Sequence, residues 1–308
     1  MIKHLLTGEE IRKNEFENLI ELSSAMKANR GTSKAITPLT GKSIGTIFAK
    51  SSTRTRVSFE VGIHELGGQC VYLDQGKTQM GRGETVADTA RVLSRYFHGI
   101  VIRTYKQSDV EELAKYASCP IINALTDDYH PCQALTDMFT IYEKTGGKFE
   151  GIKMAYLGDG SSNMANSLML AARVAGIHFE IGAPEEYRPC EKVMAETLGG
   201  SGTVSWTTDP AEAVKDADFI YTDVWVSMGF EEEAKERMRI LEPYRLDMAA
   251  LNKAKPGAMV MHCLPAHRGE EVAADVMDSD MSIVFDEAEN RLHVQKAVMT
   301  MIYNNLAK

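Results

Sequence analysis

The stretch that decides the fold begins as Ile44-Gly45-Thr46-Ile47-Phe48-Ala49 and continues, after Lys50, as Ser51-Ser52-Thr53-Arg54-Thr55-Arg56-Val57-Ser58-Phe59-Glu60. The first run is apolar and predicts a buried strand, and the apolar spacing over 57–66 predicts a helix after it. A helix start presents unpaired backbone N–H groups and a partial positive charge, which favour a bound anion. Hydroxyls and a guanidinium at such a junction are suited to phosphate. The groups concerned are Ser52, Thr53, Arg54 and Thr55.

The alternative interpretation of this junction is a Ser/Thr helix cap flanked by solvated arginines. Two arginines in the first turn of a helix oppose its macrodipole unless an anion offsets them. The pattern therefore favours a phosphate-type ligand between strand and helix.

Composition limits the remaining choices. With 308 residues the chain exceeds the usual size of one core, which predicts two domains. Its 44% hydrophobic and 25% charged residues are typical of a soluble globular protein. A formal net charge of −9 argues against general binding to nucleic acid or to an anionic membrane. No apolar run of about 18 residues is present, so no transmembrane helix is expected.

Cysteine usage indicates a reducing compartment. The five cysteines are odd in number and widely scattered, without a Cys-x-x-Cys pair. Neither a disulfide framework nor a zinc knuckle is indicated. We expect a cytoplasmic protein without a bound metal or cofactor.

Strand-like and helix-like segments alternate along nearly the whole chain, which predicts parallel sheets built from right-handed crossovers. A final helix is expected over about 287–305, and a polar break at 144–148 marks a boundary. The predicted fold is α/β, with two doubly wound parallel-sheet domains, a cleft between them and interdomain helices. The first predicted domain is 1–145 together with the C-terminal helix 287–308, and the second is 146–286. The expected strands are 44–49, 69–73, 98–103, 120–124, 153–158, 177–182, 203–206, 218–222, 258–262 and 282–285.

Two groups in the first half are candidates for a site, each with a structural alternative. Arg103 closes an apolar run, where a basic residue can equally be solvated. His130 and Gln133 face one way if a helix begins at Pro131. A lone histidine is nevertheless more often a satisfied structural residue.

In the second half, polar groups again follow predicted strands. The turn after 153–158 lacks a full G-x-G-x-x-G pattern and no ribose-binding acid follows it, so nucleotide binding is weakly supported. Asn163 stands instead near a helix start, where its amide can meet a polar amino-acid group. Asp223 can accept hydrogen bonds from a substrate ammonium, and the alternative is an exposed loop.

The segment His262-Cys263-Leu264-Pro265 places a thiol directly after a strand. A catalytic Cys–His pair has to be considered. However, adjacent residues of an extended chain point in opposite directions, which places His262 poorly for activating Cys263. A metal site is possible but lacks a recognisable ligand spacing. Arg291, taken alone, suggests structural pairing with nearby acids.

Together these segments resemble the transcarbamylase family, the aspartate/ornithine carbamoyltransferases, over essentially the whole chain. Ser-Thr-Arg-Thr-Arg at 52–56 and His-Pro-Cys-Gln at 130–133 carry the general resemblance. The segments 223–229 and 262–265 are similar to the members that act on ornithine, since the aspartate enzymes have a different Pro-rich sequence at the latter position. Departures at Ala49 and Ser162 concern only local loop packing.

The resemblance implies carbamoyl transfer from carbamoyl phosphate to the δ-amine of L-ornithine, giving L-citrulline and phosphate through a tetrahedral intermediate. It implies catalytic roles for Arg103, His130, Cys263 and Arg291. Residues implied to bind carbamoyl phosphate are Ser52, Thr53, Arg54, Thr55, Gln79, Arg103, His130, Gln133, Cys263, Leu264 and Arg291. Residues implied to bind ornithine are Asn163, Asp223, Ser227 and Met228.

The family also implies a homotrimer, with Gln79 reaching carbamoyl phosphate across a subunit interface. Three rival functions stay open at this point. The first is a putrescine carbamoyltransferase, which needs no partners for an α-carboxylate and an α-amine. The second is a non-catalytic binding protein on the same fold, and the third is a nucleotide-dependent oxidoreductase.

Overall fold

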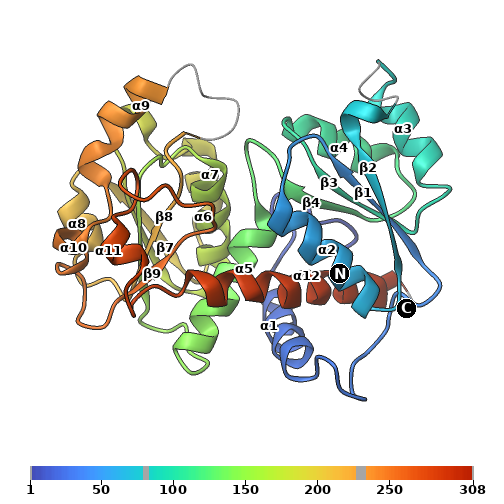
Figure 1. The fold of residues 1–308 in the computed structure, drawn as a ribbon, viewed down its shortest axis with the longest axis horizontal. Helices are drawn as coiled ribbons and strands as arrows, with labels where there is room; N and C mark the ends of the chain where they lie inside the picture. The colour runs from blue at the N-terminus through green and yellow to red at the C-terminus, as the bar shows by residue number, and fades with distance from the viewer. Residues whose placement is uncertain (1, 79–82, 227–233, 307–308) are drawn as a thin grey trace. The chain divides into compact units, whose positions relative to one another are not determined.

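A computed structural model describes residues 2–78, 83–226 and 234–306 (Figure 1). The chain divides into two compact units, Met1–Phe139 with Asn290–Lys308, and Thr140–Glu289. Each unit contains one sheet, and every strand pair found among the described residues is parallel. Two helices, α5 (Pro131–Lys144) and α12 (Val284–Leu306), contribute residues to both units.

The sheet of the first unit has the strand order β2-β1-β3-β4. Strands β1 and β3 are buried almost throughout, which explains why both are continuously apolar rather than alternating. Strand β2 lies at the edge and is more exposed. The strands are β1 (Ser43–Phe48), β2 (Gln69–Asp74), β3 (Gly99–Arg103) and β4 (Ile121–Leu125), and the helices are α1 (Lys13–Ala28), α2 (Thr53–Glu65), η1 (Gln75–Lys77), α3 (Val86–Leu93) and α4 (Gln107–Tyr116).

The sheet of the second unit has the order β7-β6-β5-β8-β9. Its strands are β5 (Lys153–Leu157), β6 (His178–Gly182), β7 (Thr203–Thr207), β8 (Phe219–Thr222) and β9 (Met259–Met261). The helices are α6 (Asn163–Ala175), η3 (Glu185–Tyr187), α7 (Glu191–Thr197), α8 (Pro210–Val214), α9 (Ala234–Leu241), η5 (Glu242–Tyr244), α10 (Met248–Leu251) and α11 (Ala274–Met277).

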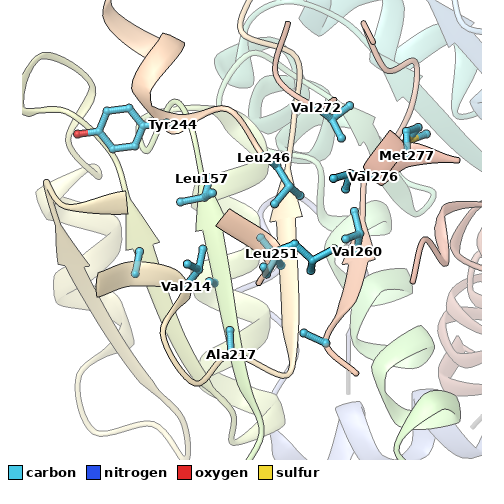
Figure 2. Packing of buried hydrophobic residues seen from close by; sticks show 14 of the residues in the cluster. Leu157, Val214, Ala217, Tyr244, Leu246, Leu251, Val260, Val272, Val276 and Met277 are labelled. Atoms are coloured by element: carbon cyan, nitrogen blue, oxygen red, sulfur yellow. The ribbon is translucent and has the colours of Figure 1, made fainter. Parts of the chain in front are cut away.

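A buried apolar cluster packs along β5, β8 and β9 and the segments that cover them (Figure 2). Leu157 and Val260 of this cluster come from the sheet, and Leu246, Val272 and Val276 come from the segments that cover it. All five side chains are fully buried. Close packing of these side chains holds the three strands in place, and the loops that follow the strands start from them.

Both strand orders reverse direction once, which makes both sheets doubly wound. The chain runs from β1 outward to β2 and then returns to β3 on the other side, and it reverses in the same way between β5 and β8. In open α/β sheets ligands bind at such switch points, beyond the carboxyl ends of the strands. The residues at these two points are 51–55 with Arg103, and 159–163 with Asp223.

The predicted fold class of two parallel α/β sheets is confirmed, and nine of the expected strands correspond to β1–β9. The tenth, 282–285, is wrong. Ser282 makes only an isolated bridge with Val260, and α12 begins at Val284. A short apolar run does not by itself distinguish a strand from the start of a buried helix. No helix in the described part of the chain has the length and hydropathy needed to cross a bilayer.

Candidate functional site

The phosphate motif lies where β1 passes into α2. Ser52 is the N-cap of α2, and its hydroxyl accepts a hydrogen bond from the Thr55 backbone N–H at 3.2 Å. Arg56 turns along the helix, where Nε donates to Glu60 Oε1 at 2.7 Å and the guanidinium lies 3.8 Å from the Tyr72 ring centroid. Arg54 is half-buried and has no hydrogen bond or ion pair with any residue that the structure describes. The cap therefore forms, and Arg54 keeps its full set of donors.

Two guanidiniums meet at the Thr55 hydroxyl. Arg103 Nη1 lies 3.4 Å from Thr55 Oγ1, and Arg291 Nη2 donates to the same oxygen at 2.7 Å. All three residues are buried. Arg103 ends β3 beside the end of β1, whereas Arg291 reaches the position from the second turn of α12. Two buried cations at one point form a strong site for negative charge.

His130 belongs to the same electrostatic environment. Burial lowers the pKa of its imidazole well below the usual value, and the charges of Arg291 and Arg103 lower this pKa further. At neutral pH His130 is therefore neutral and has one N–H to donate. Gln133 lies in the first turn of α5, where its Nε2 donates to Asp137 Oδ1 at 2.8 Å.

Lys50 connects the phosphate motif to the segment before His130. Its ammonium is buried, pairs with Asp127 and lies 4.4 Å from the Tyr105 ring centroid. Sequence reasoning assigned Lys50 no role. Its place between β1 and the Ser/Thr motif is the signal that could have drawn attention to it.

In the second unit, Asp223 and Cys263 meet beyond the ends of β8 and β9. Cys263 Sγ donates to Asp223 Oδ1 at 3.1 Å, and the same oxygen accepts the Val224 N–H at 2.8 Å. Burial raises the pKa of Asp223, while the hydrogen bonds from the Cys263 thiol and the Val224 N–H oppose that rise. Stabilisation of this carboxylate therefore depends on donors brought to it, such as an ammonium.

Asp223, His262 and Cys263 also offer one ligand atom each within 4.8 Å of one another. Carboxylate, imidazole and thiolate are ordinary zinc ligands. However, His262 Nε2 is hydrogen-bonded to Glu271 and Nδ1 accepts the Leu264 N–H. A metal ion would have to break one of these bonds. The Cys–His alternative is likewise disfavoured, because the thiol is directed to Asp223.

Asn163 begins α6, which is capped by Ser162. The preceding turn is held by Asp159, which accepts hydrogen bonds from Ser161 and pairs with the buried Arg237. Arg237 Nε also donates to the Trp225 carbonyl at 2.7 Å. Arg237 thus joins the loop after β5 to the loop after β8, a function that sequence reasoning missed.

The structure gathers the expected residues into two groups. The first unit holds Ser52, Thr53, Arg54, Thr55, Arg103, His130, Gln133 and Arg291, and the second holds Asn163, Asp223, Cys263 and Leu264. Gln79, Ser227 and Met228 lie outside the described residues.

Two domain families match the two halves of the chain. Residues 3–143 match the family described as the carbamoyl-P binding domain of aspartate/ornithine carbamoyltransferase. Residues 150–302 match the Asp/Orn binding domain of the same enzymes. The chain belongs to the aspartate/ornithine carbamoyltransferase family. The prediction that it is a transferase is confirmed.

Relatives within this family match nearly the whole chain. An ornithine carbamoyltransferase of Oceanobacillus iheyensis is 51% identical over 304 residues, covering 97% of this chain and 94% of the relative. One from Thermococcus kodakarensis is 49% identical over 308 residues, covering 99% and 97%. The solved structure of the Pyrococcus furiosus ornithine carbamoyltransferase superposes with a TM-score of 0.93 at 48% identity, covering 98% of this chain and 97% of that one.

Proposed function

We propose that this carbamoyltransferase transfers the carbamoyl group of carbamoyl phosphate to the δ-amine of L-ornithine, giving L-citrulline and phosphate. The observation that carries the proposal is the convergence of Arg103 and Arg291 on the Thr55 hydroxyl, at the start of a helix that already favours an anion. The names of the relatives support ornithine as the acceptor.

Carbamoyl phosphate is bound in two parts. Its phosphate is held by the helix start and the arginines, through Ser52, Thr53, Arg54, Thr55 and Arg103, with Gln79 reaching it from a neighbouring subunit. Arg54 supports this role because its donors are uncommitted among the described residues. The carbamoyl NH2 is met by Gln133 and by the backbone at Cys263 and Leu264.

The carbonyl oxygen is surrounded by Thr55, Arg103, His130 and Arg291. A neutral His130 supports this assignment, since it donates one hydrogen bond and adds no third positive charge beside the two arginines. Each good donor to a developing oxyanion contributes about 3–4 kcal/mol to catalysis.

Ornithine is bound in the second unit. Asn163, Asp223, Ser227 and Met228 hold its amino-acid end, and Cys263 lies near the reacting amine. The buried Asp223 carboxylate, with few donors of its own, suits a cationic amino group. This set of partners favours ornithine over putrescine, which has no α-carboxylate and no α-amine to bind.

The reaction proceeds by direct attack. The neutral δ-amine adds to the carbonyl carbon and a tetrahedral intermediate forms. Phosphate then leaves with the electrons of the C–O bond, and it takes up the proton that the attacking nitrogen loses. The donor is already activated, so the mechanism requires no covalent enzyme intermediate. Holding the two reactants in place contributes about 7–11 kcal/mol.

The proposal extends to the organisation of the protein. Residues 1–145 with the helix 287–308 form the carbamoyl phosphate-binding domain, and 146–286 form the ornithine-binding domain. The active form is a cytoplasmic homotrimer with sites at its subunit interfaces. The exposed edge strand β2 and the exposed Val57 and Tyr72 support such an interface, and the five free cysteines support a reducing compartment. Light scattering should give three times the chain mass of 34.1 kDa.

The experiment that tests the activity offers four acceptors in parallel: ornithine, putrescine, acetylornithine and aspartate. In the presence of carbamoyl phosphate, colorimetric detection of the ureido product should give a strong signal with ornithine and not with the other three acceptors. Faster carbamoylputrescine formation would assign the chain to the putrescine enzymes. Carbamoyl phosphate binding without phosphate release on adding ornithine would indicate a binding protein.

A further inference from the structure

Residues 263 and 264 lie on a segment whose backbone is held in an unusual shape. Leu264 has a φ of +58°, in the left-handed region that residues other than glycine rarely adopt. Such a conformation persists only where the surroundings fix it. The segment leaves β9 at Met261 and has no regular secondary structure of its own over 262–267.

The imidazole of His262 is one element that fixes this conformation. Its Nδ1 accepts the Leu264 backbone N–H at 2.8 Å. Because an amide N–H only donates, Nδ1 carries the lone pair and the proton lies on Nε2. Nε2 is 3.1 Å from Glu271 Oε1, so it donates to that carboxylate. The contact with Glu271 therefore selects the tautomer that holds Leu264.

Glu271 also holds the far end of the segment. The same oxygen, Oε1, accepts the His267 backbone N–H at 2.6 Å. His262 and Glu271 are both buried, with exposed fractions of 1% and 0%. A second buried carboxylate, Glu287 of α12, accepts the His262 backbone N–H at 3.0 Å. Both ends of the segment are thus tied to buried acids.

We propose that Glu271 is a positioning residue for carbamoyl transfer, acting through His262. It fixes the Nε2–H tautomer of His262, which holds the Leu264 N–H and so aligns Cys263 and the 263–264 backbone with the substrates. The alignment matters for turnover only through the roles assigned to Cys263 and Leu264 above, and in that respect the inference rests on the proposed function.

Two substitutions of His262 separate its two hydrogen bonds. In His262→Asn, the amide oxygen takes the position of Nδ1 and keeps an acceptor for Leu264, while the bond to Glu271 is lost. In His262→Gln, the amide nitrogen reaches the position of Nε2 and keeps the bond to Glu271, but Leu264 loses its acceptor. We expect kcat/KM to fall by less than about tenfold in the first and by about a hundredfold in the second. Equal losses would overturn the inference.

Substitutions of the carboxylate supply the matched controls. Glu271→Gln keeps an oxygen that accepts both bonds and should stay within about threefold of the unchanged chain, whereas Glu271→Leu should fall at least as far as His262→Gln. Glu270→Gln removes the adjacent carboxylate, which contacts only His267 among the described side chains, and should change nothing. Glu271→Gln and Glu271→Leu behaving alike would contradict a role through hydrogen bonding.

A second readout does not depend on turnover. The iodoacetamide alkylation rate of Cys263, followed by peptide mass spectrometry with Cys70 and Cys190 as internal references, should rise in His262→Gln and stay constant in His262→Asn. An unchanged rate in His262→Gln would count against the positioning role. If the unchanged chain forms no citrulline but the alkylation rates differ as expected, the proposed function fails and the positioning role stands.

Discussion

Arg291 Nη2 donates a hydrogen bond to Thr55 Oγ1 at 2.7 Å, although the two residues lie 236 positions apart in the sequence. The C-terminal helix α12 brings this guanidinium to the first turn of α2, where Arg103 approaches the same hydroxyl. Thr55 thus orients two cations that would otherwise repel each other. An oxyanion formed beside them receives preorganised donors at no reorganisation cost.

Thr55→Val tests this orientation. The change keeps the side-chain shape and the backbone N–H that donates to the Ser52 hydroxyl. It removes the hydroxyl oxygen on which both arginines converge. We expect kcat to fall by about 10²–10³, measured as citrulline formation at saturating substrates.

The control for this change is Thr300→Val. Thr300 is a fully buried threonine of α12 whose hydroxyl has no hydrogen-bond partner within the described part of the chain. Its replacement should leave kcat unchanged. A Thr55→Val enzyme with normal turnover would show that the shared hydroxyl is not needed.

The depressed pKa of His130 makes stability depend on pH. Below a pH of about 6.5 the unfolded chain binds a proton at this histidine that the folded chain does not. The free energy of unfolding therefore falls as the pH drops below that value, by up to about 1.4 kcal/mol per pH unit for this one group.

In His130→Gln this contribution disappears. The slope of the free energy of unfolding against pH, measured between pH 5 and 6.5, should then decrease by the uptake of up to one proton. Urea titrations at fixed protein concentration measure the slope. His64→Gln, which changes an exposed histidine of α2, serves as the control. Identical slopes for His130→Gln and the unchanged chain would mean that the pKa of His130 is not lowered in the folded protein.

The pair between the buried Lys50 and the exposed Asp127 should couple the phosphate motif to the loop that precedes His130. Lys50→Met is expected to raise the KM for carbamoyl phosphate by about tenfold, because the phosphate motif loses its ion pair with the loop that carries Asp127. A double-mutant cycle with Asp127→Asn should give a coupling energy of about 0.5–3 kcal/mol. Lys144→Met breaks a more exposed lysine–aspartate pair, the one with Asp286, and should leave this KM unchanged. Additive effects of Lys50→Met and Asp127→Asn would contradict the coupling.

Arg237 should affect ornithine selectively. Arg237→Met removes the contacts with Asp159 and the Trp225 carbonyl that join the loops carrying Asn163 and Asp223. The KM for ornithine should rise by about tenfold or more, with the KM for carbamoyl phosphate unchanged. Arg239→Met, on the exposed face of the same helix, is the matched control. A rise in both KM values would point to a general loss of structure.

The fold could be predicted because its signals are local. Continuous apolar runs such as β1 and β3 are typical of strands covered on both faces, and the hydroxyls at 52–55 mark the start of α2. The strand prediction for 282–285 was wrong for the same local reason, because a short apolar run fits the start of α12 as well as a strand. Its helical assignment depends on packing that the sequence does not display.

The site was predicted less completely, because its contacts are long-range. Spacing alone suggested only structural pairing for Arg291, and only the family resemblance predicted a role for it at the carbonyl oxygen. Glu271 and Arg237 were missed. Glu271 lies nine positions after His262, and Arg237 lies 78 positions after Asp159. Nothing in residue type marks a buried acid or arginine as a partner until the fold brings the two together.

Direct carbamoyl transfer at this site is tested by NMR with carbamoyl phosphate labelled with ¹³C at its carbonyl carbon. The reaction is followed with and without ornithine, in the unchanged chain and in Arg54→Ala. We predict equal amounts of citrulline and phosphate, formed only when ornithine is present, and turnover lowered by at least about a hundredfold in Arg54→Ala. Phosphate release that does not require ornithine, a carbamoyl adduct on Cys263, or unchanged turnover in Arg54→Ala would contradict direct transfer at this site.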